Sequence, residues 1–86
     1  MLRPAEHICW VVETRGVTLV SRDGAAPLSI PYPHAALWGV IADGHYTPQS
    51  ARAMMALLCR TDEAYAEREI ARVLAGWQDM GLVIRE

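Results

Sequence analysis

The fold of this chain is decided by residues 28–44, which read LSIPYPHAALWGVIADG. Residues 28–30 alternate apolar and polar side chains, which is typical of a strand with one solvated face. From Pro33 onward, apolar residues recur at the helical spacing i, i+3 and i+4: Leu37, Val40 and Ile41. Asp43-Gly44 then gives a helix stop signal. The stretch therefore predicts a short strand that leads directly into a helix.

Two further strands are predicted before this stretch. Residues 8–12 and 17–20 are rich in β-branched and aromatic side chains, and Thr14-Arg15-Gly16 between them is a turn signal. The two runs therefore predict a hairpin. A second break at Arg22-Asp23-Gly24 leads into the strand at residues 28–30, because Asp-Gly favours positive φ.

Prolines bracket the third predicted strand. Pro27 precedes Leu28-Ser29-Ile30 and Pro31 follows it. Since proline cannot donate to a β-ladder, it is confined to edge strands and strand ends. The strand is therefore predicted to be short, to lie at the edge of the sheet, and to leave unpaired backbone groups there.

A second helix is predicted after Gly44. Thr47 followed by Pro48 is an N-cap with proline in the first helical position, and the helix is expected to end near Arg60. Its predicted apolar stripe follows the spacing i, i+3, i+4, i+7: Ala51, Met54, Met55 and Leu58.

The third predicted helix is the longest. Thr61 supplies a capping hydroxyl, and Asp62 and Glu63 place negative charge at the positive end of the helix dipole. Gly81 ends the helix, with Leu82 placed for the hydrophobic contact of a Schellman cap, and residues 82–84 form a last strand-like segment. The predicted apolar stripe is Ile70, Val73, Leu74 and Trp77.

These elements predict one α+β domain over residues 1–86, winged-helix-like, with a three-stranded antiparallel sheet (about 7–31) followed by three helices (about 33–81). The length allows a single modest core, and 52% hydrophobic residues argue against disorder. The net charge of −2 and the absence of like-charge runs disfavour nucleic acid binding. No apolar stretch approaches a membrane span and no signal-peptide pattern opens the chain, so a cytoplasmic location is expected.

No residue pattern indicates catalysis, a metal or a cofactor. The three histidines are scattered, without a paired or clustered spacing that binds metal. Cys9 and Cys59 lie fifty positions apart and are interpreted as reduced, half-buried thiols. Nucleophile and phosphate-loop motifs are also missing. The sequence therefore predicts a binding protein that is not an enzyme.

The charged residues of the third helix allow two interpretations. Glu69 and Arg72 can pair at i, i+3 on a solvated face. Alternatively, Arg68 and Arg72, one turn apart, border a groove that receives an acidic or polar peptide. Trp38 and Trp77 are interpreted as core residues, because no basic neighbours favour base stacking.

Two segments carry a resemblance to a known family. Residues 36–47, ALWGVIADGHYT, and residues 69–83, EIARVLAGWQDMGLV, resemble the PqqD-like family. The shared pattern is an apolar residue, Trp, an apolar pair, Asp-Gly and a helix N-cap, then a helix ending in Gly-Leu-Val. The match spans most of residues 28–84.

The resemblance implies a RiPP recognition element, a module that captures the leader segment of a ribosomally made precursor peptide. The leader adds as an antiparallel strand to the third strand, in a groove walled by the third helix, and is presented to a partner modifying enzyme. That partner could be a radical enzyme, a lasso-forming protease and cyclase, or a cyclodehydratase. The expected peptide-binding residues are Leu28, Ser29, Ile30, Tyr65, Arg68, Glu69, Arg72 and Val73.

Two other functions are compatible with the same elements. A winged-helix transcription regulator would insert the third helix into the DNA major groove, but that helix carries more acids than bases, and only five residues follow Gly81. A small structural subunit that stabilises a larger enzyme would lack a free groove. These alternatives differ from the leader-binding hypothesis in what the third helix contacts.

Overall fold

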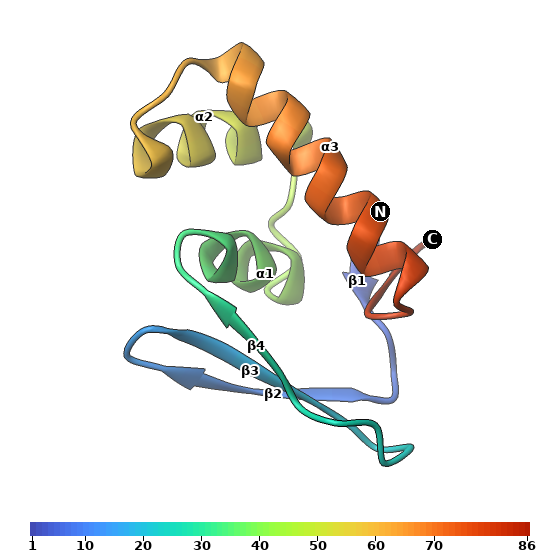
Figure 1. Cartoon of the computed structure of the whole chain (residues 1–86). Helices are drawn as coiled ribbons and strands as arrows, with labels where there is room; N and C mark the ends of the chain where they lie inside the picture. The colour runs from blue at the N-terminus through green and yellow to red at the C-terminus, as the bar shows by residue number, and fades with distance from the viewer.

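The computed structural model describes all 86 residues. It confirms an α+β fold in which a three-stranded antiparallel sheet is followed by three helices, and it adds a second, two-stranded sheet. In chain order the elements are β1 (Leu2–Pro4), β2 (Ile8–Glu13), β3 (Gly16–Ser21), β4 (Leu28–Pro31), α1 (His34–Ala42), α2 (Pro48–Cys59), α3 (Glu63–Asp79) and β5 (Val83–Arg85). Figure 1 shows the helices above the main sheet.

The main sheet has the order β2-β3-β4, so β4 lies at an edge as predicted, and β2 lies at the other edge. The predicted hairpin is β2–β3, with the Thr14-Arg15 turn between its strands. The first residue of β3 must be glycine, because a Cβ on Gly16 would lie 2.1 Å from the carbonyl oxygen of Ile30. This close approach brings β3 against β4 at the end nearest α1.

The hydrogen bonds that flank the sheet fix the direction in which each backbone group points. The N–H of Tyr32 donates to the carbonyl of Arg15, which continues the register that pairs Ile30 with Val17. Because antiparallel pairs alternate between bonded and non-bonded, Ile30 and Leu28 bond to β3, whereas the N–H and C=O of Ser29 point to the free edge.

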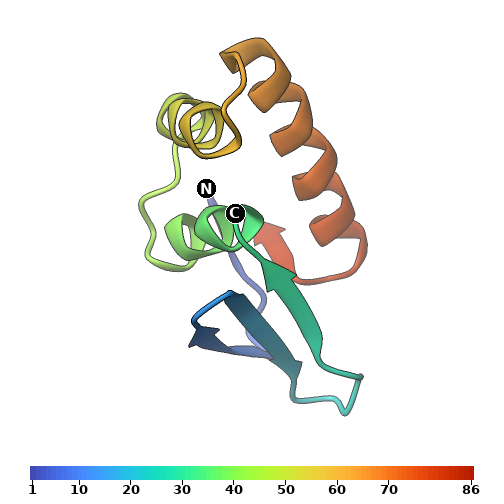
Figure 2. The same ribbon diagram turned by 60° about the vertical axis from the view of Figure 1, so that its left-hand side comes forward.

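One face of the main sheet packs against the helices. Val17, Leu19 and Ile30 are buried on that face, and α1 packs on β3 and β4. Figures 1 and 2 show all three helices on this side of the sheet, and the other face is uncovered. The core contains 19 buried apolar residues, among them Trp38 and Trp77, as predicted.

A two-stranded sheet closes the chain. The strand-like segment predicted at residues 82–84 is β5, and it pairs antiparallel with β1, a strand that the sequence pattern did not indicate. The N-terminal amine donates to the carbonyl of Glu86, and Arg3 forms a 2.7 Å ion pair with the Glu86 side chain. The C-terminal end of α3 is therefore tied to the N-terminus of the chain.

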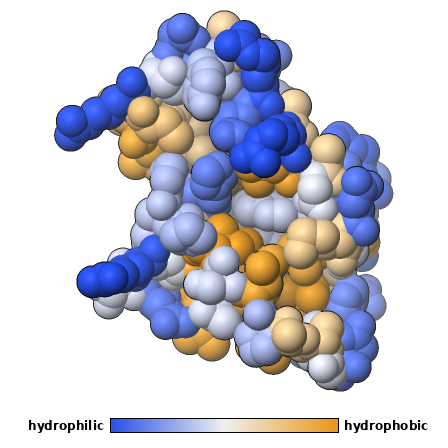
Figure 3. Space-filling view, in the orientation of Figure 1, coloured by the Kyte–Doolittle hydropathy of each residue, from blue (hydrophilic) through white to orange (hydrophobic).

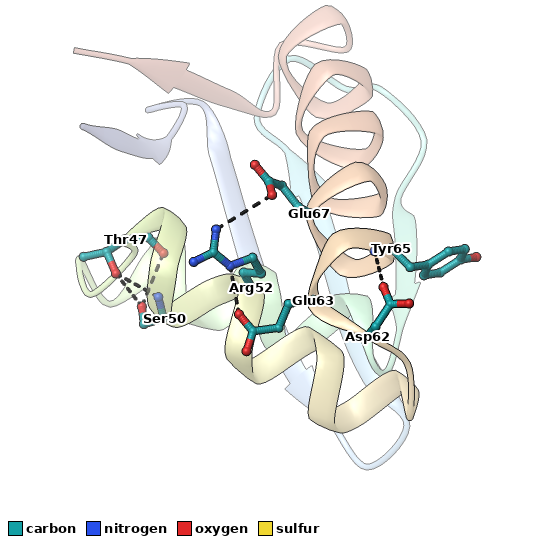
Figure 4. Close-up of polar contacts among 7 residues, drawn as sticks. All are labelled: Thr47, Ser50, Arg52, Asp62, Glu63, Tyr65 and Glu67. Carbon is teal, nitrogen blue, oxygen red and sulfur yellow. Dashed lines mark hydrogen bonds and ion pairs between the residues drawn. The ribbon is translucent and has the colours of Figure 1, made fainter.

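The helix boundaries agree with the sequence signals except at one cap. The Thr47 hydroxyl accepts from the N–H of Ser50, with Pro48 in the first helical position (Figure 4). The prediction of Thr61 as the cap of α3 is wrong: the Asp62 carboxylate accepts from the N–H of Tyr65 at 2.7 Å. Either residue type can cap a helix, and the chain uses the one with the negative charge.

Leucine 82 completes the Schellman cap that was predicted at the end of α3. Gly81 has φ +73°, its N–H donates to Gln78, and the N–H of Leu82 donates to Trp77 at 2.9 Å. This pair of bonds is the Schellman pattern. It turns the chain from α3 into β5.

Helix α2 is held against α3 by apolar and ionic contacts. Ala51 and Met55 are buried, but Leu58 is 48% exposed, so the predicted apolar stripe ends one turn early. Arg52 bridges to Glu63 at 3.0 Å and to Glu67 at 3.7 Å, as Figure 4 shows. The ion pairs therefore replace apolar packing at the solvent side of this helix pair.

The two cysteines differ in exposure. Cys59 is half-buried as predicted, but Cys9 is exposed on the uncovered face of the sheet, because no helix packs there. No helix combines the length and the apolar character that crossing a bilayer requires.

Candidate functional site

A groove lies between the free edge of β4 and the C-terminal half of α3. Its volume is about 310 Å³, and half of the ten residues that line it are hydrophobic. Apolar side chains gather in the lower middle of the face seen in Figure 3, below hydrophilic side chains at its top. The groove is lined by Leu28, Ser29, Ile30, Pro31, His34, Arg72, Val73, Gly76, Trp77 and Met80.

On the β4 side, the groove is bordered by a short unpaired strand edge that offers a single backbone N–H donor. The register turns residues 27, 29 and 31 toward the free edge, and two of these are proline. Only Ser29 therefore presents an N–H, while Ser29 and Pro31 both present carbonyls. Prolines at outward positions protect an edge against indiscriminate strand pairing. An added strand can still exchange two hydrogen bonds with Ser29.

The floor of the groove is apolar and rigid. Val73 and Trp77 are 9% and 7% exposed, and Ile30 is buried beside them. The Trp77 ring meets Trp38 edge to face, with centroids 5.6 Å apart, and Trp38 meets Trp10 in the same way at 5.7 Å. Such aromatic contacts fix ring positions and contribute beyond their buried area. The floor is therefore shaped before any ligand binds.

Glycine 76 opens the α3 side of the groove. It lies within the helix, half-buried, and a Cβ built on it would contact nothing within 4 Å. Glycine in a helix interior destabilises the helix by about 1 kcal/mol relative to alanine. No close packing in the chain requires glycine here, so its visible effect is to leave space in the groove.

Two polar side chains, His34 and Arg72, are among the residues that line the groove. The Nε2 atom of His34 is buried without a hydrogen-bond partner, although His34 lines the groove. The Arg72 side chain is 70% exposed and donates to Glu69 at 2.6 Å. The unpaired His34 nitrogen is unusual because buried polar atoms are nearly always bonded. An occupant with polar backbone groups could supply its partner.

No family model, curated protein or solved structure matches the chain. Five of the eight residues predicted to bind peptide line the groove: Leu28, Ser29, Ile30, Arg72 and Val73.

The other three predicted residues lie farther along α3. Tyr65, Arg68 and Glu69 surround a separate shallow hollow, which shares Arg72 with the groove. There the Arg68 guanidinium lies 5.9 Å from the centre of the Tyr65 ring. They precede the groove residues of α3 along the helix, because β4 crosses α3 nearer its C-terminal end. These residues could contact only an occupant that extends beyond the groove.

The sequence interpretation missed five groove residues: Pro31, His34, Gly76, Trp77 and Met80. The signal for three of them was available, because Val73, Gly76, Trp77 and Met80 repeat at i, i+3, i+4 and i+7. This face of the helix continues in both directions from Val73, and the groove lies toward Met80 instead of toward Tyr65. For His34, the first residue of α1, no pattern in the sequence gave its place beside α3.

Proposed function

We propose that the chain is a peptide-binding protein which captures the leader segment of a ribosomally made precursor and presents it to a separate modifying enzyme. The observation that carries this proposal is the groove between β4 and α3, which combines a free strand edge with an apolar floor. The resemblance of residues 36–47 and 69–83 to the PqqD-like family supplies the class of ligand. The chain itself acts by binding and has no catalytic role.

The groove fits an extended peptide better than a compact small molecule. The peptide aligns antiparallel to β4 and exchanges two hydrogen bonds with Ser29, as in other cases of β-strand addition. Its side chains alternate between the groove and solvent. One inward side chain, apolar and of medium size, occupies the space above Val73 and Trp77 that Gly76 leaves open.

Charge at the rim adds a preference for the peptide's polar residues. Arg72 is mostly exposed and its pair with Glu69 is a surface pair, which contributes little to stability. Its guanidinium is therefore free to turn toward an acidic side chain of the leader. A contact of this kind affects the association rate and the choice of partner more than the fold.

The test is binding of a fluorescein-labelled peptide, taken from the N-terminal half of any open reading frame of a few dozen residues that flanks the gene of this chain. Fluorescence anisotropy is measured for the wild-type chain and for Ser29→Pro and Ser29→Ala. Proline removes the single outward N–H of β4, whereas alanine keeps it. We expect Ser29→Pro to lose about 1–2 kcal/mol, roughly fivefold to thirtyfold in Kd, and Ser29→Ala to bind like wild type.

The thermal transition of each variant separates binding from folding. The Ser29 N–H faces outward, so Ser29→Pro should unfold near the wild-type temperature. Ile30→Pro is the contrast, because its N–H bonds to β3 and its side chain is 4% exposed. That variant should be strongly destabilised. Equal peptide affinity in wild type and a folded Ser29→Pro would rule out strand addition at β4.

A further inference from the structure

The opposite edge of the sheet, β2, is also unpaired, and it offers more free backbone N–H groups than β4. The alternation that turns Val17 and Leu19 of β3 toward β4 turns Ile8, Trp10 and Val12 of β2 outward. The N–H of Ile8 already donates to the carbonyl of Ala5, so Trp10 and Val12 present the free N–H groups of this edge. None of the three outward residues is proline. Soluble proteins normally blunt such an edge with proline, lysine or a bulge. β2 has none of these, and the chain contains no lysine.

The same edge carries exposed apolar side chains on both faces. Val12 is 71% exposed and Trp10 38% on the side of the helices, and Val11 is 57% exposed on the uncovered side, where Val20 of the neighbouring strand β3 is 41% exposed. α1 packs mainly on β3 and β4 and meets β2 through the contact of Trp38 with Trp10, so Val12 at the end of β2 is left uncovered. Clustered apolar surface beside a free edge marks a protein interface.

We propose that this edge binds a second copy of the chain, β2 against β2, antiparallel about a two-fold axis at Trp10. A two-fold axis places the same surface on both partners, and an antiparallel strand pair satisfies that condition with an identical strand. The N–H groups of Trp10 and Val12 then donate to the carbonyls of Trp10 and Ile8 of the other copy. Three strands from each copy form one continuous sheet, with all helices on the same side.

Residue complementarity selects this register. With Trp10 opposite Trp10, Ile8 faces Val12 and Cys9 faces Val11 of the other copy, so residues 8–12 meet only residues 8–12. The next residues outward, His7 and Glu13, then oppose each other, and an imidazole N–H can donate to the carboxylate. Shifting the axis to Val11 would instead place Glu13 opposite Cys9. Favourable opposite pairs stabilise a strand pairing and unfavourable ones oppose it.

This inference goes beyond the proposed peptide binding and does not depend on it. The sheet order β2-β3-β4 places the two-fold axis at one edge and the groove at the other. Both grooves of the dimer therefore remain open, at the two outer ends of the shared sheet.

The mass of the full-length chain in solution tests the proposal, measured by light scattering on a size-exclusion column from micromolar to millimolar concentration. We expect a concentration-dependent dimer. Val11→Lys should remain monomeric throughout, because it places a charge in the pairing. Leu57→Lys is the matched control, since Leu57 is 79% exposed on α2, and it should dimerise like wild type. A monomeric wild-type chain, or a dimeric Val11→Lys, would overturn the proposal.

Oxidative cross-linking tests the register, in a Cys59→Ser background. Cys9 and Val11 of the other copy form a non-hydrogen-bonded pair, whose Cα atoms lie about 4.5 Å apart, within reach of a disulfide. Val11→Cys should therefore give a covalent dimer on oxidation. Adding Cys9→Ser should abolish it, since two residues 11 lie diagonally, about 7–8 Å apart. Cross-linking that persists without Cys9 would contradict the register.

Discussion

Replacing Gly76 with leucine should raise the stability of the protein and weaken peptide binding. Gly76 is the one groove residue whose side chain is missing, and its added Cβ would meet no atom within 4 Å. A leucine side chain therefore enters the groove without displacing the fold. Few substitutions are expected to move stability and function in opposite directions, which makes this one a sharp test of the site.

The two magnitudes follow from the position of Gly76. Exchanging a helix-interior glycine for a strong helix former stabilises the fold by about 0.5–1 kcal/mol. In a domain of this size that raises Tm by about 2–8 °C. The peptide's apolar anchor loses its place above Val73 and Trp77, and failing to bury such a side chain costs about 1.5–3 kcal/mol, roughly tenfold to 150-fold in Kd.

The assay pairs thermal unfolding with anisotropy of the labelled leader peptide. Gly39→Leu is the matched control, because Gly39 is also a helix-interior glycine with nothing within 4 Å of an added Cβ, but it does not line the groove. The control should bind the leader like wild type. If a folded Gly76→Leu also binds the leader at wild-type affinity, the peptide does not occupy this groove.

Two further predictions concern charge. Arg72→Glu should weaken leader binding at low salt, and the loss of affinity should shrink as salt rises, because salt screens the interaction between charges. Arg60→Glu, at the far end of α2, is the control and should leave affinity unchanged. Anisotropy titrations at several salt concentrations check both variants. Asp62→Ala should lower stability by about 1 kcal/mol through loss of the α3 cap. Thr61→Ala should have little effect on unfolding in urea, and the reverse order of these two variants would place the cap at Thr61.

The order and type of the main elements followed from local sequence signals. Residue period, turn signals and caps specify the β2–β3 hairpin, the edge strand β4 and all three helices, because each signal acts within a few residues. The strand pairing β1–β5 did not follow. It joins Leu2 to Arg85 across the whole chain, and three-residue strands are too short to show a period.

The sequence placed a groove between the third strand and the third helix, and the groove in the structure includes the predicted Arg72 and Val73 but extends toward Met80 instead of Tyr65. Periodicity defines which residues share a helix face, so Tyr65, Arg68, Arg72 and Val73 were all candidates for the same wall. The position along α3 at which β4 crosses the helix depends on tertiary packing. It is set by the core beneath the groove, where Trp38 lies between the other two tryptophans.

The residues at the free edge of β4 determine which contacts should dominate leader binding. β4 offers one N–H, at Ser29, because Pro27 and Pro31 occupy the other outward positions. A ladder with one donor contributes only about 1–2 kcal/mol, less than burial of a medium-sized apolar side chain. Leader affinity should therefore depend more on apolar contacts with the groove floor than on hydrogen bonds to the β4 backbone.

The ranking of two variants tests this balance. Gly76→Leu, which fills the space above the floor, should reduce leader affinity more than Ser29→Pro, which removes the donor. Both variants are measured with the same labelled peptide and under the same salt conditions. A larger loss in Ser29→Pro would mean that the backbone ladder, in spite of its two prolines, carries most of the recognition, and that Gly76 has another role in α3.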